Sequence, residues 1–145
     1  MADAEFKLGV VKLGCIDAAP LLDLLFDERA DREDLDTRSF TSGAKLDPAS
    51  CEAVTAQCLA YKADLVLIVS PNAALPGPTA ARNALVEAGV ITIAIGDAPS
   101  KKAFFKKNDE GKQVKNVPDN LGFFILPADP MIGARREFLD PTEMA

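Results

Sequence analysis

The chain has 145 residues, of which 48% are hydrophobic, and its 16 basic and 22 acidic side chains give it a net charge of −6. This size and composition argue against a disordered or fibrous protein, and the excess of acids argues against a nucleic acid or an anionic membrane surface as a partner. Its apolar runs are far shorter than the roughly 20 residues that span a membrane. The acidic start at residues 1–5 is unlike a signal peptide, so we expect a soluble, cytoplasmic protein.

The chain contains no histidine, which removes the commonest general base and the commonest metal ligand. Its three cysteines, Cys15, Cys51 and Cys58, are odd in number and do not have the spacing of metal ligands. We therefore predict neither a metal site nor a disulfide framework. In a reducing compartment we expect all three to be small, buried apolar side chains.

Apolar segments rich in β-forming residues are separated by segments with a helical period. In chain order the predicted elements are strand 6–13, helix 20–29, strand 35–40, helix 48–61, strand 65–69, helix 79–88, strand 90–95 and strand 121–126. The residues that define the helical periods are Leu21, Leu24 and Leu25 in the first helix, Cys51, Val54 and Cys58 in the second, and Ala81, Ala84, Leu85 and Ala88 in the third.

The strand at 65–69 is apolar throughout rather than alternating, which is typical of a sheet that is covered on both faces. Strands and helices alternate, and crossover connections between parallel strands are nearly always right-handed. The order therefore predicts an α/β fold, an open and mostly parallel doubly wound (Rossmann-like) sheet with helices on both faces. We expect residues 1–145 to form a single ligand-binding domain.

Two segments stand outside this regular order. The stretch 97–120 is long for a loop and holds Lys101, Lys102, Lys106, Lys107, Lys112 and Lys115, so it is either a flap or insertion or simply an exposed helix and turn. The last residues, Asp140 to Ala145, have the capping pattern of a helix start without the helix. We interpret the chain as the N-terminal part of a longer one; the alternative is a natural tail.

In open parallel sheets ligands bind outside the carboxyl ends of the strands. Five loops of the chain fall at that edge, and we call them the rim loops: 14–17, 41–45, 70–78, 96–99 and 127–133. Prolines fix the backbone of the third loop, and glycines in the others allow a ligand to approach the backbone closely. Each loop could be a plain turn, but five on one edge favour a binding site.

Known nucleotide motifs fit these loops poorly. Gly9 and Gly14 have the spacing of P-loop glycines, but Cys15 and Ile16 stand where a P-loop needs Lys and Ser or Thr. The Gly-x-Gly-x-x-Gly fingerprint of NAD-binding proteins is also missing after the first strand. An ordinary nucleoside triphosphatase and ordinary NAD binding are therefore not predicted.

Charged and polar residues of the rim loops are the candidates for contacts with a ligand. Ser42, Gly43 and Lys45 can hold an anion together with the amides before the second helix, although Lys45 could simply be exposed. Arg135 and Arg136 can clamp a carboxylate or phosphate, or pair with acids nearby. Asp97 and Asp129 follow strand ends, where each can stabilise a cationic ligand or merely form a turn.

At these loops the sequence resembles the coenzyme F420-dependent methylenetetrahydromethanopterin dehydrogenases of archaea. The matching stretches are 24–34, 42–45, 70–78, 96–99 and 128–144, and the resemblance extends over nearly the whole chain. The most specific stretch runs from Ala128 to Pro141, and family members are considerably longer than this chain. The sequence differs from the family in Gly14-Cys15-Ile16-Asp17, where Gly-Asn-Ile-Gly is usual, and in the lysine-rich segment 101–115.

The resemblance implies reversible hydride transfer between methylenetetrahydromethanopterin and the deazaflavin coenzyme F420, in a cytoplasmic homo-oligomer. Such a transfer needs two carbons held at near-attack distance and no histidine base. Asp97 and Asp129 would favour the pterin cation electrostatically. The predicted cofactor-binding residues are Gly14, Cys15, Ile16, Ser42, Gly43, Lys45, Ser70, Pro71, Asn72, Pro76 and Gly96; the predicted substrate-binding residues are Asp129, Pro130, Met131, Arg135 and Arg136.

Two other classes of function remain open at this level. Because a fold does not determine an activity, the chain could be a regulatory or carrier module that binds a pterin or deazaflavin without catalysis. It could also be an assembly domain whose apolar surfaces pack against other subunits.

Overall fold

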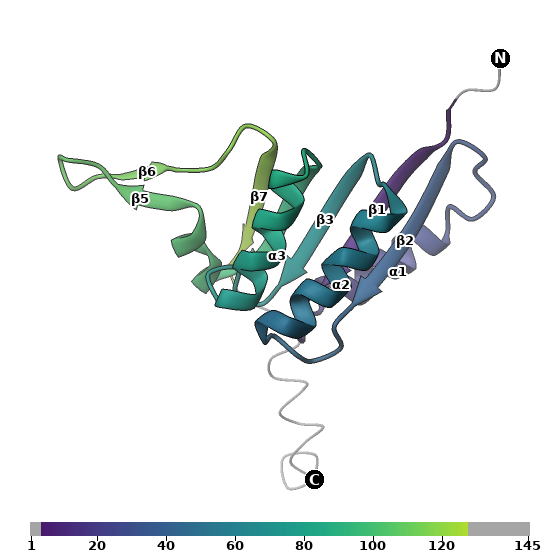
Figure 1. The fold of residues 1–145 in the computed structure, drawn as a ribbon, viewed down its shortest axis with the longest axis horizontal. Helices are drawn as coiled ribbons and strands as arrows, with labels where there is room; N and C mark the ends of the chain where they lie inside the picture. The colour runs from purple at the N-terminus through teal and green to yellow at the C-terminus, as the bar shows by residue number, and fades with distance from the viewer. Residues whose placement is uncertain (1–3, 128–145) are drawn as a thin grey trace, which may run out of the picture.

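The computed structural model describes residues 4–127. Five strands form one sheet in the order β2-β1-β3-β4-β7, and every neighbouring pair in it is parallel (Figure 1). A separate antiparallel hairpin is made by β5 and β6. The elements are β1 (Phe6–Lys12), α1 (Ala18–Asp27), β2 (Leu35–Thr41), α2 (Pro48–Tyr61), β3 (Leu65–Ser70), α3 (Pro76–Glu87), β4 (Ile91–Asp97), the 3₁₀ helix η1 (Ala98–Ala103), β5 (Phe105–Lys107), β6 (Gln113–Lys115) and β7 (Leu121–Leu126).

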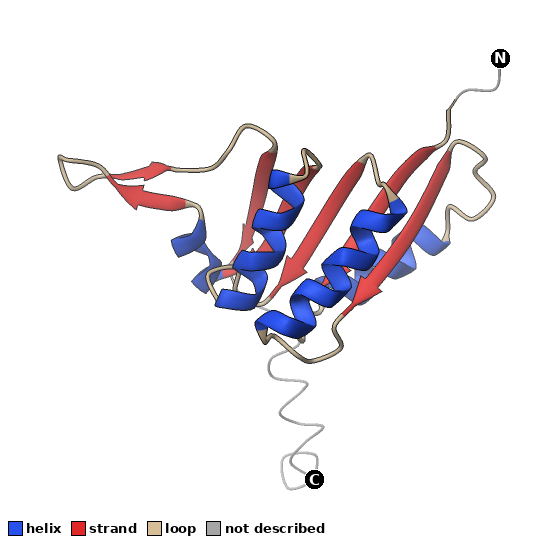
Figure 2. Ribbon diagram, in the orientation of Figure 1, coloured by secondary structure: helices blue, strands red, loops and turns tan. Residues whose placement is uncertain are grey.

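Helices lie on both faces of the sheet, which confirms the predicted doubly wound α/β class. Figure 2 shows α2 and α3 in front of the sheet and α1 behind it. Under α2 and α3, the strands contribute Val11, Val66 and Ile68 to the larger apolar core. A smaller core under α1 contains Val10, Ile16, Ala19 and Val69.

The helix α2 has the bounds expected from its sequence. The Asp47 side chain accepts a hydrogen bond from the Ser50 amide at 2.9 Å, and Pro48 occupies the first turn. Cys51, Val54 and Cys58 are buried, as their spacing predicts. The helix α3 begins at Pro76, three residues before the predicted start, because prolines suit a first helical turn, where no backbone amide is needed.

The predicted buried face of α1 is wrong. Leu21, Leu24 and Leu25 are 63%, 65% and 46% exposed, whereas Ala19 is buried and Leu22 and Phe26 pack against the core beneath it. The apolar surface of α1, opposite Asp23 and Asp27, is wider than the side that meets the sheet, so the spacing of the leucines does not indicate which part of it is buried. The helix starts at Ala18, and from there Ala18, Leu22 and Phe26 follow one another at intervals of four residues on the side that packs.

The prediction for the cysteines is correct at two positions and wrong at one. Cys51 and Cys58 are buried, and burial raises the pKa of the Cys58 thiol to about 11, so this side chain behaves as a small apolar group. Cys15 is exposed. It follows Gly14, whose φ of +75° turns the chain out of β1 into the first rim loop, and the side chain there lies at the surface.

The lysine-rich stretch forms η1 and the β5–β6 hairpin, which extends away from the main sheet (Figure 1). Phe104 is fully buried at the junction of η1 and β5, and its ring stacks on Phe123 of β7 with centroids 4.6 Å apart. In the hairpin turn, Asn108 Oδ1 accepts hydrogen bonds from the amides of Glu110 and Lys112. The stretch is therefore a short helix and a projecting hairpin joined to the main sheet at Phe104. Whether it acts as a flap or is an exposed segment without function stays a prediction.

Candidate functional site

The first two rim loops are tied together at the carboxyl edge of the sheet. The amide of Gly14 donates to Ser42 Oγ at 3.3 Å, and Lys12 Nζ donates to the Gly43 carbonyl at 3.1 Å. Leu46 lies so close to Gly14 that a Cβ on Gly14 would be 2.7 Å from Leu46 Cγ. Glycine is therefore required at position 14 both for its positive φ and for this contact.

The third rim loop meets the chain between the second rim loop and α2 at Gly77, in the first turn of α3. A Cβ on Gly77 would lie 2.1 Å from the Leu46 carbonyl oxygen and 2.8 Å from Cys51 Sγ. Both distances are far below ordinary van der Waals contact, so only glycine allows α3 to start this close to the chain entering α2. The Pro-Gly-Pro sequence at 76–78 thus fixes the start of α3 against its neighbour.

The third rim loop is joined through Ala73 to Ser100 of η1, the residue that directly follows the fourth rim loop. The Ala73 amide donates to Ser100 Oγ at 2.9 Å, and Ser100 is fully buried. The Ala73 carbonyl accepts hydrogen bonds from Arg82 Nη1 at 2.8 Å and from Thr79 Oγ1 at 3.1 Å. Gly96 makes room for this link, because a Cβ there would lie 2.2 Å from Ser100 Oγ.

Arg82 is a buried cation that is not among the predicted site residues. Its guanidinium lies 5.3 Å from the centroid of the Phe104 ring, and desolvation by burial lowers its pKa. Its side chain donates to the Ala73 carbonyl of the 70–78 loop and also contacts Phe104, where the hairpin begins. The signal that could have found it is its place between Ala81 and Leu85, because Arg82 shares with these two apolar residues the side of α3 that is buried. Ser100 and Leu46 had no comparable signal.

Several predicted site residues therefore gather on one edge. Ser70 and Gly96 are paired neighbours at the ends of β3 and β4, and Asp97 ends β4 with 7% exposure. Asn72 follows β3, where its Oδ1 accepts a hydrogen bond from the Ala74 amide at 3.0 Å. Gly43 and Lys45 are exposed on the second loop. Pro71 and Pro76 belong to the third loop, and Gly14 and Cys15 to the first.

Ile16 is placed differently from the rest, because its side chain is 3% exposed and belongs to the core under α1. Asp129, Pro130, Met131, Arg135 and Arg136 lie outside the described residues, so the fifth rim loop has no structural account. Among residues 4–127 no group of three or more Cys, Asp or Glu side chains is arranged to hold a metal ion. Within the same range no helix is long and apolar enough to cross a membrane.

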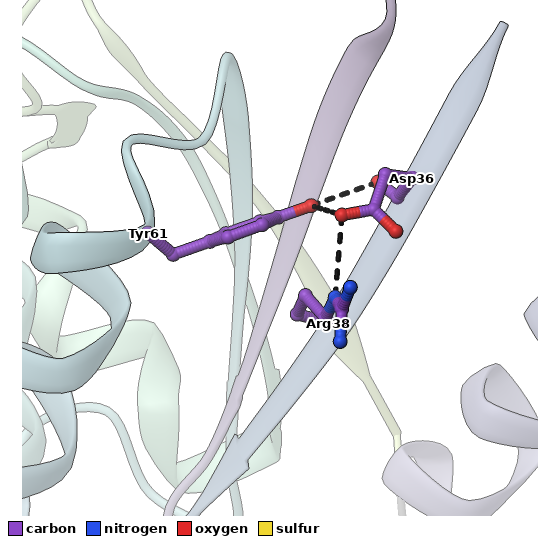
Figure 3. Close-up of polar contacts among 3 residues, drawn as sticks. All are labelled: Asp36, Arg38 and Tyr61. Carbon is purple, nitrogen blue, oxygen red and sulfur yellow. Dashed lines mark hydrogen bonds and ion pairs between the residues drawn. The ribbon is translucent and has the colours of Figure 1, made fainter.

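A second polar cluster lies at the opposite end of β2, away from the rim loops. Tyr61 Oη donates to Asp36 Oδ2 at 2.6 Å, and Arg38 Nε donates to the same oxygen at 3.2 Å (Figure 3). The hydrogen bond from Tyr61 is the largest cause that lowers the pKa of Asp36. This cluster fastens the edge strand to the end of α2.

A family model described as methylene-5,6,7,8-tetrahydromethanopterin dehydrogenase matches residues 6–145. The chain belongs to this family. An F420-dependent methylenetetrahydromethanopterin dehydrogenase from Archaeoglobus fulgidus is 52% identical over 140 residues, which are 96% of this chain and 46% of that protein. The protein of the same name from Methanocaldococcus jannaschii is 46% identical over 140 residues, again 96% of this chain and 47% of that protein. The resemblance inferred from the rim loops is thereby confirmed.

A solved structure of an F420-dependent methylenetetrahydromethanopterin dehydrogenase, in complex with methylenetetrahydromethanopterin and coenzyme F420, has a TM-score of 0.73 and 36% identity to this chain. The match covers 97% of this chain and 48% of the solved chain. The chain thus spans about half the length of the relatives in this dehydrogenase family.

The rim loops have features that fit a bound deazaflavin coenzyme. Gly43 has a φ of +68°, and nothing lies within 4 Å of a Cβ built there, so a ligand can approach this backbone directly. Lys45 on the same loop is exposed and can approach an anionic group. The hydrogen bonds through Ser42, Ala73 and Ser100 hold the loops in place before a ligand arrives.

Proposed function

We propose that this chain is the α/β ligand-binding part of an enzyme that reversibly transfers a hydride between methylenetetrahydromethanopterin and coenzyme F420, in the one-carbon metabolism of an archaeon. The proposal is supported by membership of the dehydrogenase family and by the solved relative that holds both compounds. The strongest support from the structure is that the first four rim loops, which carry glycines and prolines, lie linked to one another along one edge of the sheet.

In this proposal the coenzyme supplies the ring that accepts the hydride and a proton, and the pterin is left as a methenyl cation. The protein positions both ligands and stabilises charge. Gly14, Cys15, Ser42, Gly43 and Lys45 are on the loops that would contact the coenzyme. Ile16 supports the first of these loops from the core and, given its burial, contributes through packing.

The third and fourth rim loops would complete the coenzyme site through Ser70, Pro71, Asn72, Pro76 and Gly96. Asp97 is proposed to favour the cation electrostatically; its position at the end of β4, next to β3, and its 7% exposure support this role. A carboxylate in such a partly dehydrated position acts more strongly than one in water.

The remaining assignments follow the family alone. Asp129 is the second electrostatic candidate, and Asp129, Pro130, Met131, Arg135 and Arg136 are proposed to bind the pterin. The working enzyme is proposed to be a cytoplasmic homo-oligomer that needs the further half of the family's chain.

The test uses a chimaera in which these 145 residues replace the matched portion of the Archaeoglobus fulgidus relative. Mixed with methylenetetrahydromethanopterin, it should bleach the absorption band of oxidised coenzyme F420. Asp97→Asn should lower kcat by about 100-fold, the size of effect expected for one electrostatic group in an active site. Asp109→Asn, in the exposed hairpin turn, is the matched control and should leave kcat unchanged.

Binding of both ligands without any bleaching would favour the non-catalytic binding module instead. Equal kcat values for Asp97→Asn and Asp109→Asn would remove Asp97 from the proposed site while leaving the reaction in place.

A further inference from the structure

The two faces of the main sheet are covered unequally. Over residues 4–127, α2 and α3 lie on one face and α1 lies on the other (Figure 2). Phe104, at the end of η1, belongs to the core under α2 and α3. The connection from β4 to β7 therefore passes through a residue of the first face. Consequently no described helix covers β4 and β7 on the α1 side.

The register of the strands shows which residues form this bare area. Leu67 pairs with Ile93, Val69 pairs with Ile95, and Ile95 pairs with Phe124, so these side chains share the α1 face. Ile91 and Phe124 are 58% and 61% exposed. We call the set Ile91, Ile93, Ile95, Phe124 and Leu126 of β4 and β7 the bare apolar face; at its border Ile95, together with Leu67 of β3, packs against the core under α1.

The other edge of the same face has a different composition. On β2 the residues that share the α1 side through pairing with β1 are Leu35, Thr37, Ser39 and Thr41, and Ser39 donates a hydrogen bond to Asp23 of α1. Except for Leu35 at its start, the strand carries hydroxyl side chains on this face, namely Thr37, Ser39 and Thr41. The apolar residues of β4 and β7 are therefore typical of a surface that another segment covers.

The helix α1 extends the bare apolar face. Asp23 faces β2, so the opposite flank of the helix, with Leu21 and Leu25 one turn apart, faces along the sheet toward β3 and β4. These two leucines are 63% and 46% exposed. A covering segment would pack against the strands β4 and β7 and, at its side, against Leu21 and Leu25 of α1.

We propose that the bare apolar face, together with Leu21 and Leu25, is the surface on which the other half of the family's chain packs. More than half of the Archaeoglobus fulgidus relative has no counterpart in these 145 residues, since the match covers 46% of it. A parallel sheet that is apolar on both faces is covered on both within one domain. The face also reaches Asp97 and Leu126, which pair at the carboxyl edge, so the covering half would border the rim loops.

This inference depends on the architecture and not on the proposed reaction, and its test needs no activity. In the chimaera defined above, p-benzoylphenylalanine replaces Phe124 and the protein is irradiated. We expect a cross-linked product of monomer mass whose cross-linked peptide comes from the transplanted half. A product of dimer mass would show that a second copy occupies the face and would overturn the inference.

A thermal measurement supplies an independent readout. Phe124→Lys should change the Tm of the 145-residue chain by less than about 2 °C, because the side chain is exposed there, but should lower the Tm of the chimaera by about 8 °C or more. Gln57→Lys, at an exposed position on α2, is the control and should change neither Tm.

Equal effects of Phe124→Lys in both chains, with no cross-link, would show that the face stays in water and would also overturn the inference. Should the chimaera be insoluble, the Archaeoglobus fulgidus relative, labelled at the position that aligns with Phe124, gives the same cross-linking readout.

Discussion

Tyr61 is the residue whose chemistry the structure describes most fully. Its hydroxyl donates to Asp36, 25 residues earlier in the chain, and thereby closes the end of α2 onto the edge strand β2 (Figure 3). Burial and the hydrogen bond to Asp36 raise the pKa of Tyr61, and the same bond holds the pKa of Asp36 below its ordinary value. No local pattern could have predicted this pair, since two partners so far apart are brought together only by the sheet.

Tyr61→Phe should lower the free energy of unfolding at pH 7 by about 1–2 kcal/mol, because it removes a hydrogen bond to a charged acceptor that is only partly exposed. The stabilisation due to the lowered pKa of Asp36 is present at neutral pH and is lost as the pH falls through that pKa. The stabilisation due to the raised pKa of Tyr61 is present below the ordinary tyrosine pKa of 10.0 and is lost as the pH rises above it. Urea unfolding between pH 3 and pH 11 measures both effects.

The variant should therefore have a flatter stability profile than the wild type at both ends of this range. Asp36→Asn is the matched control, because an amide oxygen can still accept from Tyr61 but cannot ionise. A Tyr61→Phe profile that runs parallel to the wild-type profile above pH 10 would contradict the assignment.

Among the elements, α2 and α1 show where a sequence pattern is sufficient and where it is not. The cap at Asp47 and Pro48 predicts where α2 begins, and the spacing of Cys51, Val54 and Cys58 predicts its buried side. In α1 the leucines lie on several sides, so the pattern admits more than one orientation. The choice depends on the shape of the sheet face against which the helix packs, which the sequence of the helix does not describe.

The β5–β6 hairpin depends on one buried ring. Phe104→Ala should remove the stacking on Phe123 and the contact with Arg82 and should cost about 3–5 kcal/mol of unfolding free energy. Amide hydrogen exchange of residues 105–115 should then accelerate well beyond that of β3, as expected for a hairpin that loses its anchor.

Phe105→Ala is the control for this experiment, because Phe105 is only partly buried and meets Phe123 edge-on at 5.5 Å. It should have the smaller effect on both measurements. Equal losses for the two variants would mean that the hairpin is held by its own turn rather than by the junction at Phe104.

At the scale of the whole molecule, alternation and handedness predicted the doubly wound class and the edge at which the rim loops meet, whereas the strand order β2-β1-β3-β4-β7 is known only from the structure. The links that join those loops could not be predicted. Leu46 touches Gly14 and Gly77, and Ser100 bonds to Ala73, only because distant segments converge there. A glycine in a sequence indicates a positive φ or a close contact with its backbone, but it does not indicate which residue makes that contact.

The net charge of −6 gives a last prediction for the molecule as a whole. The ion pairs among residues 4–127 are Arg32 with Asp34, Arg38 with Asp36, and Lys112 with Glu110, and each includes at least one side chain more than half exposed. Such pairs contribute little, so screening them costs little, whereas screening the repulsion among the excess acids stabilises the folded chain. Raising NaCl from 20 to 300 mM at pH 7 should therefore increase the Tm by about 2–4 °C.

The control is the same salt series near the sequence pI of about 4.6, where the net charge is close to zero and the gain should largely disappear. A Tm that falls with salt at pH 7 would show that the ion pairs outweigh the general repulsion. An equal gain at both pH values would assign the effect to the hydrophobic surface, which salt also favours burying, rather than to charge. Scanning calorimetry of the 145-residue chain distinguishes the three outcomes, because only relief of charge repulsion depends on pH in the expected sense.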